Sequence, residues 1–192
     1  KFSEQMKYLH DSGFTTISLD QLYDAYQGKA VLPEKPIVLT FDDGYPDNYT
    51  VAFPVLKQNN FKATFFVSTG AVGPGMMTWD QLKEMQEYGM SIESHTVNHF
   101  DLRTLAPAQQ RKELAGSKQA IESKLGTKVK FFCYPSGKYN DVTLKILNEF
   151  GYKLAVTTVY GNAKLGDPLL QLKRIRINGG SNLATFKRQV SG

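Results

Sequence analysis

Short apolar runs alternate with amphipathic segments along the whole chain. Runs of apolar and β-branched residues predict six strands, at 37–41, 62–68, 89–94, 128–134, 152–158 and 172–177. Apolar residues at helical spacing predict helices near the start of the chain and at 18–26, 46–58, 78–85, 107–125, 141–150 and 183–190. This alternation is typical of an α/β fold in which parallel strands are covered by helices.

Local signals mark several helix ends. Ser18 with Gln21, and Thr78 with Gln81, form the pattern of a capping box, and Gly126 follows the last apolar position of the long helix. The 192 residues contain no internal repeat, low-complexity tract or linker, so we expect one domain with a sizeable core.

Composition excludes several classes of protein. The net charge is +5, but the lysines and arginines are scattered and no basic helix or stacking stripe appears, which argues against nucleic acid as a partner. The single cysteine, Cys133, excludes an internal disulfide and a CxxC metal site. No run of 18 apolar residues exists, so no transmembrane segment is predicted.

Two adjacent carboxylates, Asp42 and Asp43, follow the buried strand 37–41. Like charges at a buried strand end repel each other and are costly to desolvate. A cation bound by one carboxylate would relieve that cost and leave the other free as a base, and Gly44 allows the sharp turn that both side chains need. The alternative is that the pair caps the helix that follows.

Two of the three histidines, His95 and His99, follow the strand 89–94 at a spacing of four. In a helical turn this spacing brings both imidazoles to one side, where they can hold one ion. Two histidines and one carboxylate with open positions are typical of a catalytic metal site. An HxxxH pattern alone is weak evidence, since histidine is also a common surface residue.

A third segment, Tyr134-Pro135, follows the strand 128–134 and precedes Gly137. An exposed backbone N–H at this corner would be able to stabilise an oxyanion, although the corner has a purely structural interpretation as well. In α/β folds the ligand lies at the carboxyl ends of the strands. We therefore expect Asp42, Asp43, His95 and Tyr134 at one mouth.

Together, these segments resemble the polysaccharide deacetylase family, the chitin-deacetylase-like or NodB-homology domain of carbohydrate esterase family 4. The resemblance rests on "TFDDGY" (40–45), "SHTVNH" (94–99) and "FFCYPSG" (131–137), with weaker support from "LLQLKRIRI" (169–177). It extends from about residue 33 to the end. "KATFFV" and "MTWDQLKEM" look most like the branch that acts on poly-N-acetylglucosamine or peptidoglycan.

The resemblance implies a distorted or incomplete (β/α) barrel, formed by residues 1–192 as a single deacetylase domain that lacks an upstream segment. It implies metal-dependent removal of N-acetyl groups from N-acetylglucosamine units of a chitin-like, poly-GlcNAc or peptidoglycan substrate, with release of acetate. The cofactor would be one divalent ion, Zn²⁺ before Co²⁺, Ni²⁺ or Mn²⁺. The location would be extracellular or cell-wall associated, and no oligomer is implied.

The resemblance also assigns roles to individual residues. The metal ligands would be Asp43, His95 and His99, and Asp42 would be the general base. Thr96 would brace the histidine loop through its backbone. The backbone N–H of Tyr134, beside Pro135, would bind the oxyanion. Leu170 and Leu172 would form an apolar floor for the acetyl methyl group, with an alternative role as core residues.

The chain departs from the family pattern in three places. Cys133 stands where many members carry an arginine that tethers the base, so we expect a less depressed pKa for Asp42, or another partner such as a lysine or a backbone donor. No histidine follows residue 169 to act as general acid, and His10 fits a surface position better. Tyr160 lies where members carry an Asp-x-x-Asp-Trp element.

Two alternatives to a polysaccharide N-deacetylase therefore stay open. One is hydrolysis of another acetylated substrate, an ester or a different amide, with the same metal site and a different groove. The other is a glycan-binding module with a degraded active site, which the missing general acid favours and the intact aspartate and histidine pairs oppose.

Overall fold

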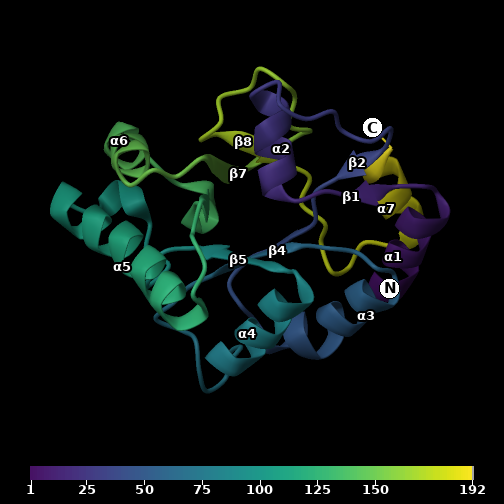
Figure 1. The fold of residues 1–192 in the computed structure, drawn as a ribbon, viewed down its shortest axis with the longest axis horizontal. Coiled ribbons are helices and arrows are strands. Elements are labelled where there is room, and N and C mark those ends of the chain that lie inside the picture. The colour runs from purple at the N-terminus through teal and green to yellow at the C-terminus, as the bar shows by residue number, and fades with distance from the viewer. Residues whose placement is uncertain (192) are drawn as a thin grey trace.

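One parallel sheet of six strands forms the centre of the computed structural model, which describes residues 1–191 (Figure 1). The strands are paired in chain order: β3 Thr40–Phe41, β4 Thr64–Val67, β5 Ser91–Ser94, β6 Phe131–Cys133, β7 Leu154–Tyr160 and β8 Leu172–Arg174. Within the described residues β3 and β8 have no ladder between them, and the sheet curls into a half-barrel. The expected α/β class and incomplete (β/α) barrel are confirmed.

Helices surround this sheet (Figure 1). They are α1 Phe2–Asp11, α2 Leu19–Tyr26, α3 Phe53–Gln58, α4 Trp79–Tyr88, α5 Pro107–Leu125, α6 Asp141–Glu149 and α7 Leu183–Val190. Both predicted capping boxes are present, at Ser18 and at Thr78, and Gly126 ends α5 in the left-handed conformation. No helix within residues 1–191 combines the length and apolar character needed to cross a bilayer.

The predicted strand at 37–41 is in fact two strands. Residues Pro36–Ile37 form β2, which pairs with β1, Thr15–Thr16, in a separate two-stranded parallel sheet. The chain then changes partner, because the carbonyl of Ile37 accepts from Ile17 whereas the carbonyl of Leu39 accepts from Thr64 of β4. The apolar run is continuous, but its hydrogen bonds go to two different sheets, which the sequence pattern does not reveal.

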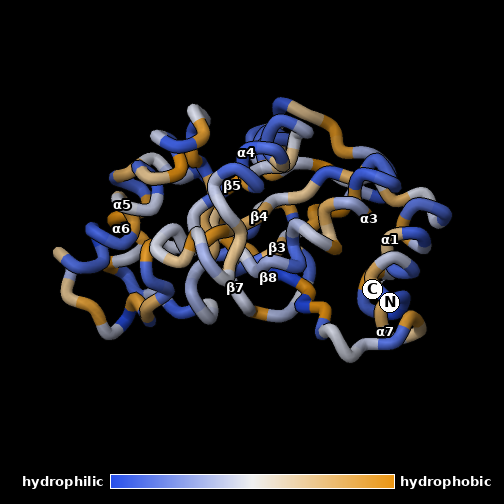
Figure 2. The backbone as a smooth tube through the Cα atoms, turned by 90° about the horizontal axis from the view of Figure 1, so that it is seen from below, coloured by the Kyte–Doolittle hydropathy of each residue, from blue (hydrophilic) through white to orange (hydrophobic). Residues whose placement is uncertain are grey.

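Apolar side chains cover both faces of the main sheet. Successive side chains of a strand point to opposite faces, so a parallel sheet that is buried on both faces needs apolar residues at nearly every position. Phe65 and Phe132 belong to the larger core cluster, whereas their neighbours Phe66 and Phe131 belong to a second cluster together with Leu19 of α2. In the perpendicular view, apolar segments gather along the central strands and polar segments lie mostly outside (Figure 2). Because both faces are buried, only the ends of the strands are left for polar chemistry.

The pairing of β5 with β6 depends on a buried side chain. Only Ser94 and Phe132 are in ladder register there. One carboxylate oxygen of Glu93 accepts from the backbone N–H groups of Lys130 and Phe131, at 3.0 and 2.9 Å, and the other accepts from Ser91 Oγ. Burial raises the pKa of Glu93 to about 7, although these three hydrogen bonds favour the charged form.

This raised pKa predicts how the stability of the fold depends on pH. Between about pH 4.5 and 7 the folded chain keeps a proton on Glu93 that the unfolded chain has lost. The stabilisation that comes from this proton is therefore fully present below about pH 4.5, and it is lost as the pH rises through 7. The amide in Glu93→Gln fits the same hydrogen bonds and cannot titrate. The free energy of unfolding of the unaltered protein, relative to Glu93→Gln, should therefore fall by about 1–3 kcal/mol over this range.

Urea unfolding at several pH values measures this difference. The exposed Glu34→Gln serves as the control, since its pH profile should run parallel to that of the unaltered protein. A Glu93→Gln profile that also runs parallel would contradict the buried-acid explanation.

Candidate active site

The two adjacent carboxylates at the end of β3 have different partners. Both oxygens of Asp42 accept from Arg174, whereas Asp43 faces His95 and His99. The backbone of Asp43 is left-handed, with φ 77°, and Gly44 continues the turn at φ 92°. Within residues 1–191, neither carboxylate accepts a hydrogen bond from a backbone N–H at the start of the helix that follows, so the alternative role as a helix cap is not what the structure shows.

The histidine loop, residues 95–99, brings the imidazoles of His95 and His99 together at the end of β5. Their ring centroids are 4.7 Å apart, and the Nε2 atom of each lies 3.3 Å from Asp43 Oδ1. The two side chains converge as predicted, but the reason we gave is wrong. The loop is not helical, because Thr96 and His99 both adopt positive φ angles, 68° and 57°.

Thr96 braces this loop as expected. Its Oγ1 donates to the carbonyl of His95 and accepts from the N–H of His99 at 3.0 Å. A single hydroxyl therefore connects the residues at both ends of the loop, and Thr96 is itself fully buried.

The trio of Asp43, His95 and His99 fits a divalent metal ion. Two atoms that are each about 2.0–2.1 Å from a tetrahedral ion lie about 3.3–3.4 Å apart, and Asp43 Oδ1 is 3.3 Å from both Nε2 atoms. His95 Nδ1 lies 2.7 Å from the carbonyl oxygen of Cys133 and must donate to it, so Nε2 is the nitrogen left for a metal. The hydrogen bond with His95 lowers the pKa of Asp43, which keeps the carboxylate ionised.

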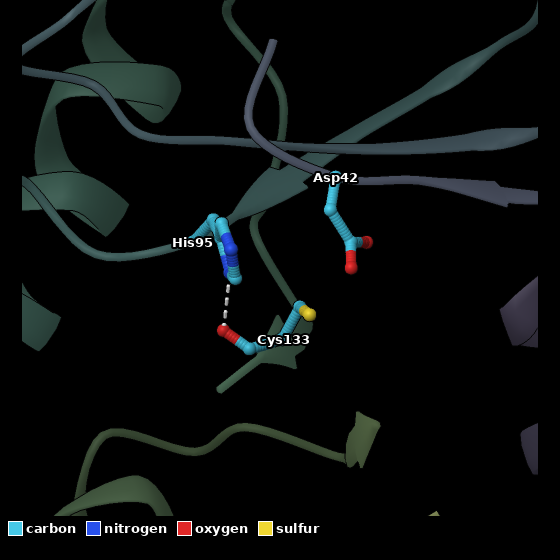
Figure 3. A group of neighbouring side chains, drawn as sticks. All are labelled: Asp42, His95 and Cys133. Carbon is cyan, nitrogen blue, oxygen red and sulfur yellow. Dashed lines mark hydrogen bonds between the residues drawn. The ribbon is translucent and has the colours of Figure 1, made fainter. Parts of the chain in front are cut away.

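A second group of possible ligands, Asp42, His95 and Cys133, lies close by (Figure 3). Its atoms already have other partners: Arg174 donates to Asp42 and also reaches Cys133 Sγ at 3.2 Å, and His95 points its Nδ1 at the carbonyl of Cys133. Burial raises the pKa of Cys133, so its sulfur stays a neutral thiol and a poor ligand. The first group is the better metal site.

Arg174, at the end of β8, is a site residue that the sequence analysis did not assign. Its guanidinium holds both oxygens of Asp42 at 2.8 Å and also donates to Thr40 Oγ1 and to the carbonyl of Thr157. We expected either a less depressed pKa for Asp42 or another partner for it. The second alternative holds, with an arginine in place of the lysine or backbone donor that we named. Burial alone would raise the pKa of Asp42, but the hydrogen bonds and charge of Arg174 outweigh burial and lower it.

One signal for this partner was present in the sequence. "LLQLKRIRI" is the weakest of the resembling segments, and it places two arginines, Arg174 and Arg176, within the predicted strand 172–177 without indicating which of them reaches the mouth. The resemblance led us to expect an arginine at the position of Cys133, and the sulfur of Cys133 is instead in contact with Arg174. The guanidinium is supplied from β8 instead of β6.

The corner at Tyr134 differs from the prediction. The backbone N–H of Tyr134 donates to Val156 of β7 at 3.3 Å, and its hydroxyl donates to the carbonyl of Leu170, so this N–H is not free for an oxyanion. Tyr134 and Pro135 are both buried. Ser136 is an exposed residue, and its backbone is left-handed, with φ 53°. Among the hydrogen bonds of residues 1–191, none involves the backbone N–H of Ser136. The free donor at this corner is that of Ser136.

The remaining candidates divide between site and core. Leu172 is 1% exposed within the cluster that contains Cys133 and Val156, so its alternative role as a core residue is correct. Leu170 is only partly buried and stays a candidate for contact with an acetyl group. His10 is exposed at the end of α1 and lies near Phe61, which precedes β4, so it is at the opposite edge of the sheet.

Comparison with known proteins gives a consistent result. The family described as polysaccharide deacetylase matches residues 29–155. YxkH of Bacillus subtilis (strain 168), a protein named as a polysaccharide deacetylase, is 38% identical to this chain over 187 residues. The poly-beta-1,6-N-acetyl-D-glucosamine N-deacetylase of Escherichia coli (strain K12) is 26% identical over 231 residues. Each alignment covers 97% of this chain, and they cover 67% and 34% of those two proteins.

A solved structure is also similar. The Streptococcus pyogenes deacetylase PplD in complex with acetate superimposes with a TM-score of 0.93 and 38% sequence identity. The match covers 98% of this chain and 85% of that one. The similarity therefore extends over the whole half-barrel and includes the segments that carry the aspartates and histidines.

The geometry predicts separate effects for the two aspartates on metal binding. Asp43→Ala removes the carboxylate between the two imidazoles and should weaken Zn²⁺ affinity at least 10-fold. Asp42→Asn should leave the affinity within about threefold, because Asp42 faces Arg174 and not the histidine pair. Competition with a chelating dye measures both affinities. Loss of the metal in Asp42→Asn, with retention in Asp43→Ala, would reverse the assignment.

Proposed function

The chain belongs to the polysaccharide deacetylase family, and from this we propose that it hydrolyses N-acetyl groups of N-acetylglucosamine units in a polysaccharide and releases acetate. We propose one divalent ion, Zn²⁺ first, bound by Asp43, His95 and His99. We extend the proposal to an extracellular or cell-wall location, since a poly-N-acetylglucosamine deacetylase is among the relatives.

A single observation carries this proposal. Asp43 lies 3.3 Å from two imidazoles, while the adjacent Asp42 is held apart from them by Arg174. Asp43 is thus available to bind a metal ion, and Asp42 is available to accept a proton. Hydrolysis of an unactivated amide needs both, an electrophile for the carbonyl and a base for the water.

The proposed roles follow from these positions. A divalent ion in this site would polarise the amide carbonyl and acidify the attacking water. Asp42 would take the proton of that water, since a carboxylate that accepts two N–H groups of Arg174 keeps further lone pairs. The N–H of Ser136 would donate to the oxygen that becomes negative in the tetrahedral intermediate.

Exposed aromatic side chains support a sugar substrate. Tyr45, Phe100 and Tyr160 are 52%, 50% and 63% exposed, and they lie just beyond Asp43, just beyond His99 and at the end of β7. All three belong to the carboxyl edge of the sheet, where the aspartates and histidines are. An aromatic face can pack against the apolar face of a pyranose ring, so these positions suit a groove for several sugar units.

A second candidate activity is hydrolysis of acetate esters. The amine of an amide needs a proton as it leaves, whereas an alkoxide can take one from water. Within residues 1–191, the one histidine outside the metal trio is His10, at the opposite edge of the sheet. We therefore expect this chain to be comparatively active on small activated acetate esters and slow on N-acetyl glycans.

Acetate release from N-acetylglucosamine oligomers, with and without Zn²⁺ after chelation, tests the function. We expect metal-dependent release that Asp42→Asn lowers about 10²–10⁴-fold, the usual effect of losing a general base. Release from esters alone would favour the second candidate. Binding of the oligomers without release from either substrate would indicate a glycan-binding module.

Arg174 gives an independent prediction. Arg174→Lys keeps the positive charge but cannot hold both oxygens of Asp42, so the base loses its orientation. We expect acetate release to fall about 10–100-fold, since a misplacement of about 1 Å can cost 10²-fold. Arg176→Lys is the matched control, because Arg176 is exposed two positions further along. Equal activities of the two variants would contradict a role for Arg174.

A further inference from the structure

The histidine loop packs against one face of α5. The residues of that face, Glu113, Gly116 and Ser117, have the spacing of three and four that places side chains on the same side of a helix. None of the three is among the proposed metal ligands, and none belongs to the motifs 40–45, 94–99, 131–137 or 169–177 on which the resemblance rests. Each of them nonetheless meets the histidine loop or the strand end that leads into it.

Glu113 makes the most extensive contact. Its Oε2 accepts from the backbone N–H groups of Val97 and Asn98, at 2.9 and 2.8 Å, and its Oε1 accepts from Asn98 Nδ2 at 2.7 Å. The side chain is almost completely buried, and within residues 1–191 it forms no ion pair. A buried carboxylate without a cation depends on its hydrogen bonds, and all three of these come from the loop.

The other two residues of the face allow a close approach. A Cβ atom on Gly116 would lie 3.1 Å from Val97 Cγ2, so the absence of a side chain lets the loop lie against the helix. Ser117 Oγ is 2.6 Å from Ser94 Oγ, which in turn accepts from the N–H of Thr96 at 3.4 Å. Helix α5 therefore contacts the chain on both sides of His95.

The loop needs this support because its backbone is strained. Thr96 and His99 are both left-handed, and such a conformation costs about 1–2 kcal/mol for a residue with a side chain. Thr96 Oγ1 satisfies the N–H of His99, and Glu113 satisfies the two N–H groups between them. Without these acceptors, the loop would be expected to relax, and the separation of the two imidazoles would change with it.

We propose that Glu113 is a positioning residue for the metal ligands. Through its hydrogen bonds to Val97 and Asn98, it holds the loop in the one conformation in which His95 and His99 both face Asp43. This inference rests on the metal site of the proposed function. It adds to that site a determinant of metal affinity that never touches the ion.

Two variants distinguish the effect of the length of the Glu113 side chain from the effect of its negative charge. Glu113→Asp keeps the charge but is one methylene too short to reach the loop. Glu113→Gln keeps the length. Its carbonyl oxygen can accept from both backbone N–H groups, and Asn98 can turn its side-chain amide so that its oxygen accepts from the amide NH2 of the new glutamine. We expect the Zn²⁺ dissociation constant to rise about 10–100-fold in Glu113→Asp, as for other partners of metal ligands, and to stay within about threefold in Glu113→Gln.

Glu122→Asp is the matched control. Glu122 also lies on α5 and also accepts from a backbone N–H, that of Val129 at 3.1 Å, but it does so at the other end of the helix. Glu122 is also paired with Lys118. Its shortening should leave Zn²⁺ affinity within about twofold, whatever it costs in folding stability. Thermal unfolding of all three variants in the absence of metal compares their stabilities.

Hydrogen exchange of the Val97 and Asn98 amides in metal-free protein gives a readout that does not depend on the metal. We expect it to be faster in Glu113→Asp than in Glu113→Gln. The proposal is overturned if Glu113→Asp binds Zn²⁺ as well as the unaltered protein, or if Glu113→Gln binds as weakly as Glu113→Asp. If the unaltered protein binds no Zn²⁺, the proposed function fails, and equal amide exchange in the two variants then overturns the positioning role.

Discussion

The ion pair between Arg174 and Asp42 joins the first and last strands of the half-barrel. No ladder connects β3 and β8 within residues 1–191, so this side-chain contact is what spans the opening at the carboxyl edge. The pair is partly buried, so loss of one partner should cost less than the roughly 3–5 kcal/mol that is typical of a fully buried ion pair. The same contact fixes the proposed base, so the closure of the fold and the geometry of the site depend on one guanidinium.

This arrangement explains how two neighbouring carboxylates are tolerated at a buried strand end. The left-handed backbone of Asp43 and the turn at Gly44 let the two side chains meet different partners. Asp42 faces a permanent cation, and Asp43 faces two imidazoles. Both pKa values are lowered, so the two carboxylates stay ionised together despite their repulsion.

The proposed metal ligands are oriented mainly by groups of the main chain and of buried polar side chains. The carbonyl of Cys133 fixes the tautomer of His95, Thr96 links both ends of the histidine loop, and Glu113 satisfies its central N–H groups. Each contact satisfies a buried polar group that would otherwise be costly. The strained loop is therefore held from the strand side by β6 and from the helix side by α5.

The sequence by itself determined the features that depend on neighbouring residues. Periodicity located every strand of the main sheet and the seven α-helices of residues 1–191, but not the short helical turns Leu102–Thr104 and Pro135–Gly137. Caps at Ser18, Thr78 and Gly126 marked helix ends. Short motifs indicated the two aspartates and the histidine pair, and the family resemblance singled out Asp43 with His95 and His99. Only the tertiary structure decided that Arg174 meets Asp42 across 132 positions, that Ser136 and not Tyr134 has the free N–H, and that Glu113 supports the loop. The physical reason is that these contacts form only when the sheet curls and distant segments meet, and local propensity contains no information about which polar atoms then lie within reach.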